Sequence, residues 1–163
     1  MPPLHFLPLD LARCDLIAAD PAAALPGLAA AEDAALVSAV AEATAAMMRA
    51  TAATPPWIGY LALREGVPVG TGAFKAPPAN GEVEIAYATL PSHERRGHGR
   101  AMAAELVRIA FAAPEVRRIV AETRAEANAS TAILAGLGFR RDGSGRDPEA
   151  GATWRWALAR PGA

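Results

Sequence analysis

The chain has 163 residues, of which 52% are hydrophobic and 20% charged, and its formal net charge is −1. This length suits one domain with a real hydrophobic core, so residues 1–163 are expected to form a single domain. The apolar and nearly neutral composition argues against intrinsic disorder. It also argues against a bulk electrostatic affinity for nucleic acid or an anionic membrane, so neither is expected as a partner.

The sequence also predicts the cellular compartment and argues against a metal site. Cys14 is the single cysteine and cannot form an internal disulfide, and the N-terminus lacks the features of a secretory signal. We therefore expect a cytoplasmic protein. Prolines and charged residues interrupt the alanine-rich stretches, which argues against a membrane span. The histidines have no cysteine or acidic partners at ligand spacing, so no metal is expected.

In chain order, the first fifty residues are predicted to be helical. Asp10 precedes a short apolar pattern that ends near Pro21. A longer pattern runs over residues 32–49, where many alanines give a high helix propensity. Pro55 and the proline after it end this region, because proline is tolerated poorly inside a helix.

The rest of the chain is predicted to alternate between strands and helices. The expected strands are rich in branched and aromatic side chains and span 57–63, 67–74, 83–90, 116–123, 139–141 and 153–158. One amphipathic helix follows the segment 94–100 and ends before Pro114, and another covers 128–137. A turn at 142–145 is expected to separate the last two strands.

The segment between the third strand and the next helix has the composition of an anion site. Glycines at 97 and 99 let the backbone approach an anion closely, and the arginines at 95, 96 and 100 add positive charge. The following helix presents unpaired N–H groups at its N-terminus. The pattern is neither a P-loop nor G-x-G-x-x-G. Taken alone, the segment fits a phosphate or pyrophosphate site and also fits a tight turn before a helix.

Two motifs, in order, resemble those of the GNAT N-acetyltransferase superfamily. The acetyl-CoA motif Q/R-x-x-G-x-G/A resembles residues 84–101, EIAYATLPSHERRGHGRA. The second motif resembles residues 128–139, NASTAILAGLGF, which look most like the RimJ/RimL branch. Glu94 stands where the family usually has Gln or Arg, and a second frame that begins at Arg96 also fits the formula. The resemblance covers residues 57–158.

The resemblance implies an α+β fold, with a mixed and mostly antiparallel twisted sheet of six or seven strands. About four helices flank the sheet, which is splayed between its fourth and fifth strands. It implies an enzyme that moves an acetyl group from acetyl-CoA (coenzyme A) to a primary amine by direct attack, without a metal. The acceptor is a protein N-terminus or a small-molecule amine. A bacterial, cytoplasmic monomer or homodimer is expected. A CoA-binding regulatory or interaction module without turnover stays open as the alternative.

The resemblance also implies which residues hold the cofactor. They lie at the end of the third strand, in the glycine loop and at the start of the second-motif helix: Ala88, Thr89, Leu90, Arg95, Arg96, Gly97, His98, Gly99, Arg100, Ala101, Asn128 and Ser130. Asn and Ser are also preferred helix N-caps, so Asn128 fits a purely structural role equally well.

The catalytic residues are assigned less completely. Glu84 matches the general base of the histone-acetylating branch, and Glu82 and Glu122 are alternatives. Many members protonate the leaving thiolate with a tyrosine on the second-motif helix, and that position is Leu134 here. Either Ser130 or water then takes this part, or the thiolate leaves unaided, so the general acid stays open.

Overall fold

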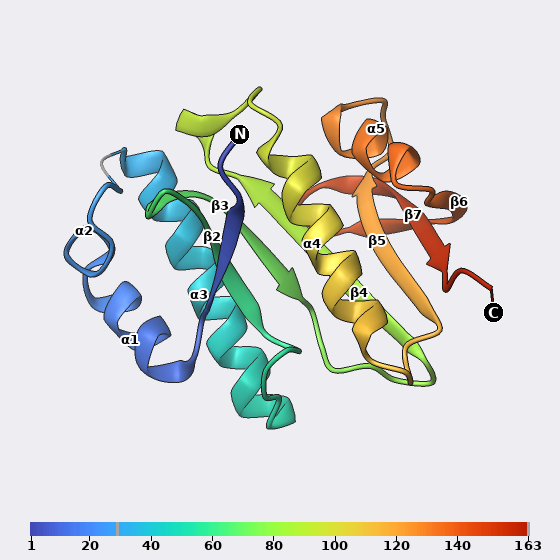
Figure 1. The fold of residues 1–163 in the computed structure, drawn as a ribbon, viewed down its shortest axis with the longest axis horizontal. Coiled ribbons are helices and arrows are strands. Elements are labelled where there is room, and N and C mark those ends of the chain that lie inside the picture. The colour runs from blue at the N-terminus through green and yellow to red at the C-terminus, as the bar shows by residue number, and fades with distance from the viewer. Residues whose placement is uncertain (29, 163) are drawn as a thin grey trace.

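A seven-stranded mixed sheet runs through the molecule, with helices on both faces (Figure 1). The computed structural model describes residues 1–28 and 30–162. The strands are β1 (Leu4–Pro8), β2 (Gly59–Arg64), β3 (Val67–Phe74), β4 (Glu82–Thr89), β5 (Arg118–Arg124), β6 (Arg140–Asp147) and β7 (Gly151–Ala159). The helices are α1 (Leu11–Ala19), α2 (Pro21–Ala24), α3 (Ala31–Thr51), α4 (His98–Ala112) and α5 (Ala129–Gly136), with a 3-10 turn η1 (Pro91–His93). The strand order is β1-β2-β3-β4-β5-β7-β6.

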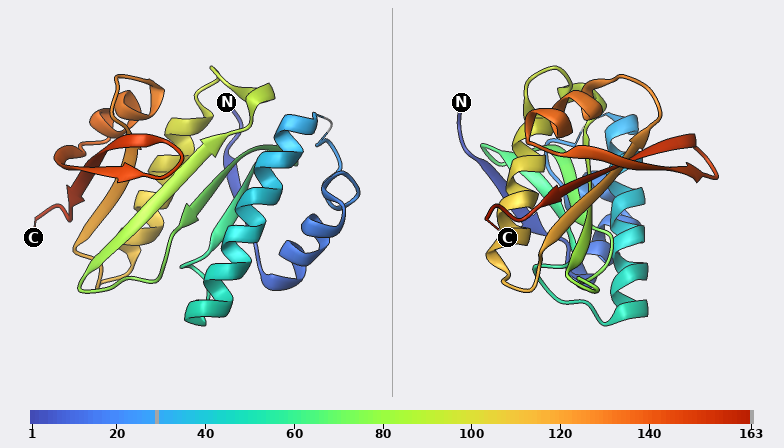
Figure 2. Two further views of the ribbon diagram at one scale, coloured as in Figure 1. Left: turned by 180° about the vertical axis from the view of Figure 1, so that it is seen from behind. Right: turned by 90° about the vertical axis from the view of Figure 1, so that its right-hand side faces the viewer.

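The helices are divided between the two faces of the sheet (Figure 2). α3 packs against β2 and β3, and α1 and α2 lie against α3. α4 packs on the opposite face against β3 and β4, and α5 lies beside α4. Apolar residues four apart explain how α4 docks, because Met102, Leu106 and Ala110 are fully buried on one side of it. Full burial of a side chain the size of Leu106 contributes about 1.5–3 kcal/mol.

The sheet is splayed between β4 and β5, as predicted. These two strands are parallel, whereas the other neighbouring strands are antiparallel. Within the described residues their register pairs Glu82 with Arg118, Val83 with Ile119 and Glu84 with Val120, and no further pair follows. β4 continues to Thr89, so most of its length has left β5. The α+β fold with a mixed, mostly antiparallel sheet is confirmed.

The prediction of a wholly helical N-terminal region is wrong for Leu4–Pro8. This segment is strand β1, which pairs antiparallel with β2 at the border of the sheet. The ring of Phe6 stacks on Tyr60 at 5.1 Å between centroids, so a contact with a distant part of the chain stabilises the extended form. Pro8 is tolerated because proline is compatible with a border strand.

The predicted turn at 142–145 is also wrong, because these residues lie inside β6. The chain turns instead at residues 148–150, between β6 and β7. The register against β7 shifts between Arg141 and Gly143, so Gly143 follows a bulge. All of β6 is exposed, and its glycines and charged residues therefore resemble a turn in the sequence.

Candidate active site

The loop before α4 is shaped by two left-handed residues. Arg95 has a φ of +63° and Gly97 a φ of +78°, and α4 begins directly after Gly97. Gly97 is the N-cap of α4, and no side chain caps the helix there. The first N–H groups of α4 therefore have no side-chain acceptor, which makes this helix end suited to an anion.

A cavity of about 550 Å³ lies at this end of α4. The candidate cofactor residues that line it come from the end of β4, the loop, α4 and α5: Ala88, Thr89, Arg95, Gly97, His98, Gly99, Arg100 and Ser130. Four further residues, which the sequence did not indicate as cofactor ligands, complete the lining: Tyr87, Glu94, Ala129 and Ile133. The sequence motifs therefore converge on one cavity, and Glu94 borders it together with the arginines.

The remaining cofactor candidates lie around this cavity without lining it. Leu90 is fully buried in the core below α3. Asn128 caps α5. Its side-chain Oδ1 accepts from the backbone N–H of Thr131 at 3.0 Å, and its backbone N–H donates to Thr131 Oγ1 at 2.9 Å. The side chain of Asn128 thus has a structural part as an N-cap. Arg96 is exposed and Ala101 is half-buried in α4. Cofactor contacts by these four residues stay a prediction.

His98 is the first residue of α4 and is held by β2. Nε of Arg64 donates a hydrogen bond to Nδ1 of His98 at 2.9 Å. The neutral ring then carries its proton on Nε2, which is left to donate to a ligand. Burial lowers the pKa of His98, and the positive charges of Arg64, His93 and Arg96 lower it further. His98 is therefore a neutral donor at the cavity at pH 7.

α4 and α5 approach closely beside the cavity. A Cβ on Gly99 would lie 3.0 Å from Cδ1 of Ile133, and a Cβ on Gly136 would lie 2.9 Å from a guanidinium nitrogen of Arg100. The Arg100 side chain thus lies along α5. Glycine at both positions lets the two helix ends come together around one site.

A second, narrower cavity of about 80 Å³ lies where β4 and β5 separate. Its walls come from both strands and from α5: Ile85, Ala86, Tyr87, Ala121, Glu122, Thr123, Ser130 and Leu134. Tyr87 and Ser130 also line the larger cavity, so the two are adjacent.

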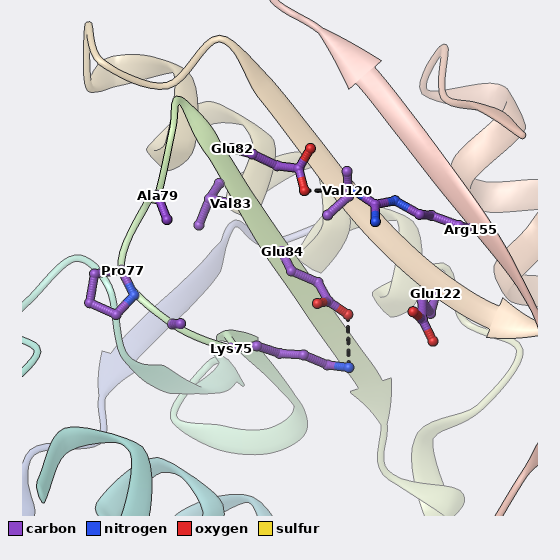
Figure 3. A pocket seen from close by; sticks show the side chains of 10 residues that line it. Lys75, Pro77, Ala79, Glu82, Val83, Glu84, Val120, Glu122 and Arg155 are labelled. Carbon is purple, nitrogen blue, oxygen red and sulfur yellow. Dashed lines mark hydrogen bonds and ion pairs between the residues drawn. The ribbon is translucent and has the colours of Figure 1, made fainter. Parts of the chain in front are cut away.

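A third cavity, of about 200 Å³, is lined by charged side chains (Figure 3). It includes Lys75 from the loop after β3, Glu82 and Glu84 from β4, Glu122 from β5 and Arg155 from β7. Glu122 also lines the narrow cavity. Neighbouring cavities share lining residues, so the three lie in a row from the N-terminus of α4, past the gap between β4 and β5, to a group of carboxylates.

The three carboxylates of this acidic cavity differ in their partners. Glu84 Oε1 lies 2.9 Å from Nζ of Lys75. Glu82 accepts from Nη2 of Arg155 at 2.6 Å and lies 3.5 Å from Arg118. No ion pair or side-chain hydrogen bond within residues 1–28 and 30–162 includes Glu122. Glu122 is the carboxylate without a partner, and it lies nearest to the gap between the strands.

Tyr87 is the residue of this row that sequence reasoning missed. Leu134, at the position of the absent tyrosine, is buried in the core. Tyr87 instead brings a phenol to the same gap from β4, on the face opposite to Glu84. Tyr87 alternates in step with Val83 and Ile85, so it lies on the apolar face of β4, which packs against α4. This alternation was the signal that could have found it.

Two other kinds of site are missing from the described residues. No group of three or more His, Cys, Asp or Glu side chains is placed to hold a metal ion within them. None of the helices in the same part of the chain combines the length and the apolar character needed to cross a membrane.

Comparison with known proteins gives the family. A model described as "Acetyltransferase (GNAT) domain" matches residues 7–140. No curated protein sequence matches the chain. Among solved structures, Mycobacterium smegmatis RimJ in complex with CoA-disulfide is 20% identical with a TM-score of 0.66, covering 96% of this chain and 81% of RimJ. RimL, an alpha-N-protein acetyltransferase, in complex with coenzyme A is 15% identical with a TM-score of 0.67, covering 96% and 94%.

A probable acetyltransferase is similar over a shorter length. It is 22% identical with a TM-score of 0.57, and the match covers 63% of this chain and 62% of that protein. The chain thus spans less than two thirds of the length of this relative. These likenesses concern the fold, whereas the family model matches most of the sequence. The chain therefore belongs to the GNAT family of acetyltransferases.

Proposed function

We propose that this enzyme transfers an acetyl group from acetyl-CoA to a primary amine by direct attack of the amine on the thioester. The observation that carries the proposal is the row of three neighbouring cavities, which runs from the N-terminus of α4 to the acidic cavity. A donor and an acceptor that enter from opposite ends of the row meet in the gap between β4 and β5. Holding both reactants in one geometry is the main requirement of such a reaction.

The pyrophosphate of the donor is proposed to lie at the N-terminus of α4. The uncapped N–H groups of α4 and the positive end of its dipole attract the phosphates. Arg95 adds a positive charge, and Nε2 of His98 adds a neutral donor. The remaining candidates for this part of the cofactor, Arg96, Gly97, Gly99, Arg100 and Ala101, surround the same helix end.

The pantetheine arm is proposed to run along the part of β4 that has left β5. The main-chain groups of Thr89 point to the β5 side and are then available to the amide groups of the arm, and Ala88 lines the same cavity. Extended ligands commonly bind a strand in this way, because each amide satisfies a main-chain partner. Leu90, Asn128 and Ser130 flank the same path.

The acceptor is proposed to enter the acidic cavity as an ammonium ion and to give one proton to a carboxylate. The neutral amine then attacks the carbonyl carbon, the C–N bond forms, and the C–S bond breaks with its electron pair on sulfur. Glu84 and Glu122 are the two candidate bases. We favour Glu122, because Lys75 pairs with Glu84 and Glu122 has no ion partner in the described part of the chain. Ser130 is the donor that the sequence suggests for the leaving sulfur.

We propose a protein N-terminus as the acceptor, ahead of a small-molecule amine. The support is the likeness of the fold to RimJ and to RimL, the latter a ribosomal L7/L12 alpha-N-protein acetyltransferase. A charged cavity beside exposed Lys75 suits the end of a flexible peptide. A cytoplasmic location and a monomeric or dimeric state are part of the same proposal.

Calorimetry with acetyl-CoA and a thiol-release assay test this function together. Acetyl-CoA is expected to bind at micromolar concentration, and free CoA thiol is expected with peptides that have a free N-terminus. If CoA thiol is released faster with polyamines or aminoglycosides than with peptides, the acceptor is a small-molecule amine and not a protein N-terminus. Binding without thiol release across the whole panel would favour a CoA-binding module, and no binding of any CoA species would overturn the proposal.

A further inference from the structure

The hydroxyl of Tyr87 is an unusual group in the gap between β4 and β5. Its oxygen is buried and has no hydrogen-bond partner among the described residues. A buried polar group without a partner costs about 1–3 kcal/mol, so such groups are uncommon unless they have a use. Burial raises the pKa of Tyr87 to about 12, and the neighbouring hydroxyl of Ser130 offsets this shift in part. Tyr87 is therefore a neutral phenol across the physiological range.

The proposed path of the donor brings the thioester sulfur beside Tyr87. Tyr87 lines both the large cavity at α4 and the narrow cavity between the strands. The acidic cavity begins at Glu122, on the other side of that narrow cavity. If the amine arrives from the acidic side, the leaving sulfur lies on the side of Tyr87. Of the two α5 side chains at this gap, Leu134 has no proton to donate, whereas Ser130 has a hydroxyl.

We propose that Tyr87 donates a hydrogen bond from its hydroxyl to the sulfur of CoA as the C–S bond breaks, in the part that no α5 tyrosine can fill. This role rests on the proposed acetyl transfer. The electron pair of the C–S bond moves onto sulfur, and the phenol keeps its proton while it stabilises the thiolate. The proton released by the amine goes to the carboxylate, so no other reactant is needed. Ser130 then supports Tyr87, because an alcohol is a weaker donor than a phenol.

Ionisation of bound coenzyme A tests this role without an acceptor. The ultraviolet absorbance of the thiolate is followed against pH for coenzyme A in complex with the wild-type chain and with Tyr87→Phe. A donor at the sulfur stabilises the thiolate, so the pKa of the bound CoA thiol is expected below that of free CoA and about one unit higher in Tyr87→Phe than in wild type. With a reactive amine, Tyr87→Phe is expected to lower kcat about tenfold or more, with little change in KM for acetyl-CoA.

Tyr60→Phe is the matched control. Tyr60 is the other tyrosine of the chain, its hydroxyl donates to the carbonyl of Pro56 at 2.8 Å, and it lines none of the three cavities. Tyr60→Phe should leave the thiol pKa and kcat unchanged. Because the Tyr87 hydroxyl makes no hydrogen bond in the fold, its removal should not reduce the melting temperature.

The outcomes separate this role from the proposed function. Absence of CoA binding to the wild-type chain would overturn both. Binding and turnover with an unchanged thiol pKa and kcat in Tyr87→Phe would overturn only the role of Tyr87. A loss found in Ser130→Ala and absent from Tyr87→Phe would also reject it and would make Ser130 the donor.

Discussion

Nζ of Lys75 lies 2.9 Å from Oε1 of Glu84, so the single lysine of the chain pairs with the carboxylate that the family resemblance indicates as the base. An acceptor ammonium that enters the acidic cavity must displace this lysine if it is to reach Glu84. Glu122 lines the same cavity without such a partner, and it also borders the gap between the strands. The ion pair therefore leaves Glu122 as the more accessible proton acceptor.

Glu122→Gln is expected to lower kcat by about a hundredfold, because an amide cannot accept the proton of the amine. Glu84→Gln is expected to have a smaller effect, since Lys75 already occupies that carboxylate. Steady-state rates of thiol release at saturating acetyl-CoA give the comparison. Glu115→Gln, at an exposed position that lines none of the three cavities, is the control and should match wild type. A larger loss in Glu84→Gln than in Glu122→Gln would reassign the base to Glu84.

Gly97→Ala is expected to weaken acetyl-CoA binding and to lower the free energy of unfolding by about 1–2 kcal/mol. An L-residue is strained at a φ of +78°, so the loop before α4 relaxes away from the geometry that exposes the helix N-terminus. Calorimetry and urea denaturation measure the two effects.

Gly66→Ala is a closely matched control for this substitution. Gly66 has the same φ of +78° and equally open surroundings, but it lies in the turn between β2 and β3. Gly66→Ala should lower the free energy of unfolding by a similar amount and leave the affinity for acetyl-CoA unchanged. Equal loss of affinity in the two variants would show that general destabilisation, and not the helix end, explains the result.

The stability of the wild-type chain is expected to fall as the pH decreases below 6.5, partly because of His98. The pKa of His98 in the folded chain is below its ordinary value of 6.5, with burial as the largest cause. The unfolded chain then binds a proton at a higher pH than the folded chain does, so protonation favours unfolding. The contribution of His98 is present above pH 6.5 and is lost as the pH falls through the lower, folded-state pKa.

Urea denaturation between pH 7.5 and 5 checks this dependence. His98→Asn keeps a side-chain oxygen that can accept from Arg64 and has no titratable group, so its stability should change less steeply with pH. His5→Asn removes a histidine at a surface position of β1 and should retain the wild-type slope. If His98→Asn followed the wild-type curve, His98 would not be the source.

Arg160→Met is expected to destabilise the fold by about 2 kcal/mol. The guanidinium of Arg160 donates to the carbonyls of Val116, Phe111 and Ala113 at 2.9, 3.0 and 2.7 Å. These acceptors lie at the C-terminal end of α4 and in the connection to β5, and hydrogen bonds from a charged donor are among the stronger ones. Chemical denaturation provides the measurement. Arg146→Met, in exposed β6, is the control and should change stability by less than about 0.5 kcal/mol.

Local patterns in the sequence predicted the elements whose own residues determine them. The apolar spacing of Met102, Leu106 and Ile109 located α4, and the glycines at 97 and 99 located the cavity at its N-terminus. The two wrong predictions, a helical segment at β1 and a turn within β6, have a common cause. Pairing with β2 and with β7 makes these segments strands, and their own composition does not indicate it.

Relationships between distant segments explain why the site could be predicted only in part. The motif gave most residues of the cavity at α4, but Tyr87 entered only when β4, β5 and α5 were placed around the same gap. The pairing of Lys75 with Glu84 joins a loop to a strand and has no signature in the sequence. The sequence predicted either a cofactor contact or an N-cap role for Asn128, because Asn is a preferred N-cap, and the structure has the N-cap.

The parallel pairing that ends at Glu84 places an open strand edge inside the molecule. Unpaired strand edges usually lie at the border of a sheet, where they can template the addition of another chain and lead to aggregation. The edge of β4 faces the narrow cavity at residues 85–87 and the larger cavity at residues 87–89, and α5 contributes to the walls of both. The fold thus keeps an unpaired backbone edge in the middle of the strand order, away from the two border strands β1 and β6.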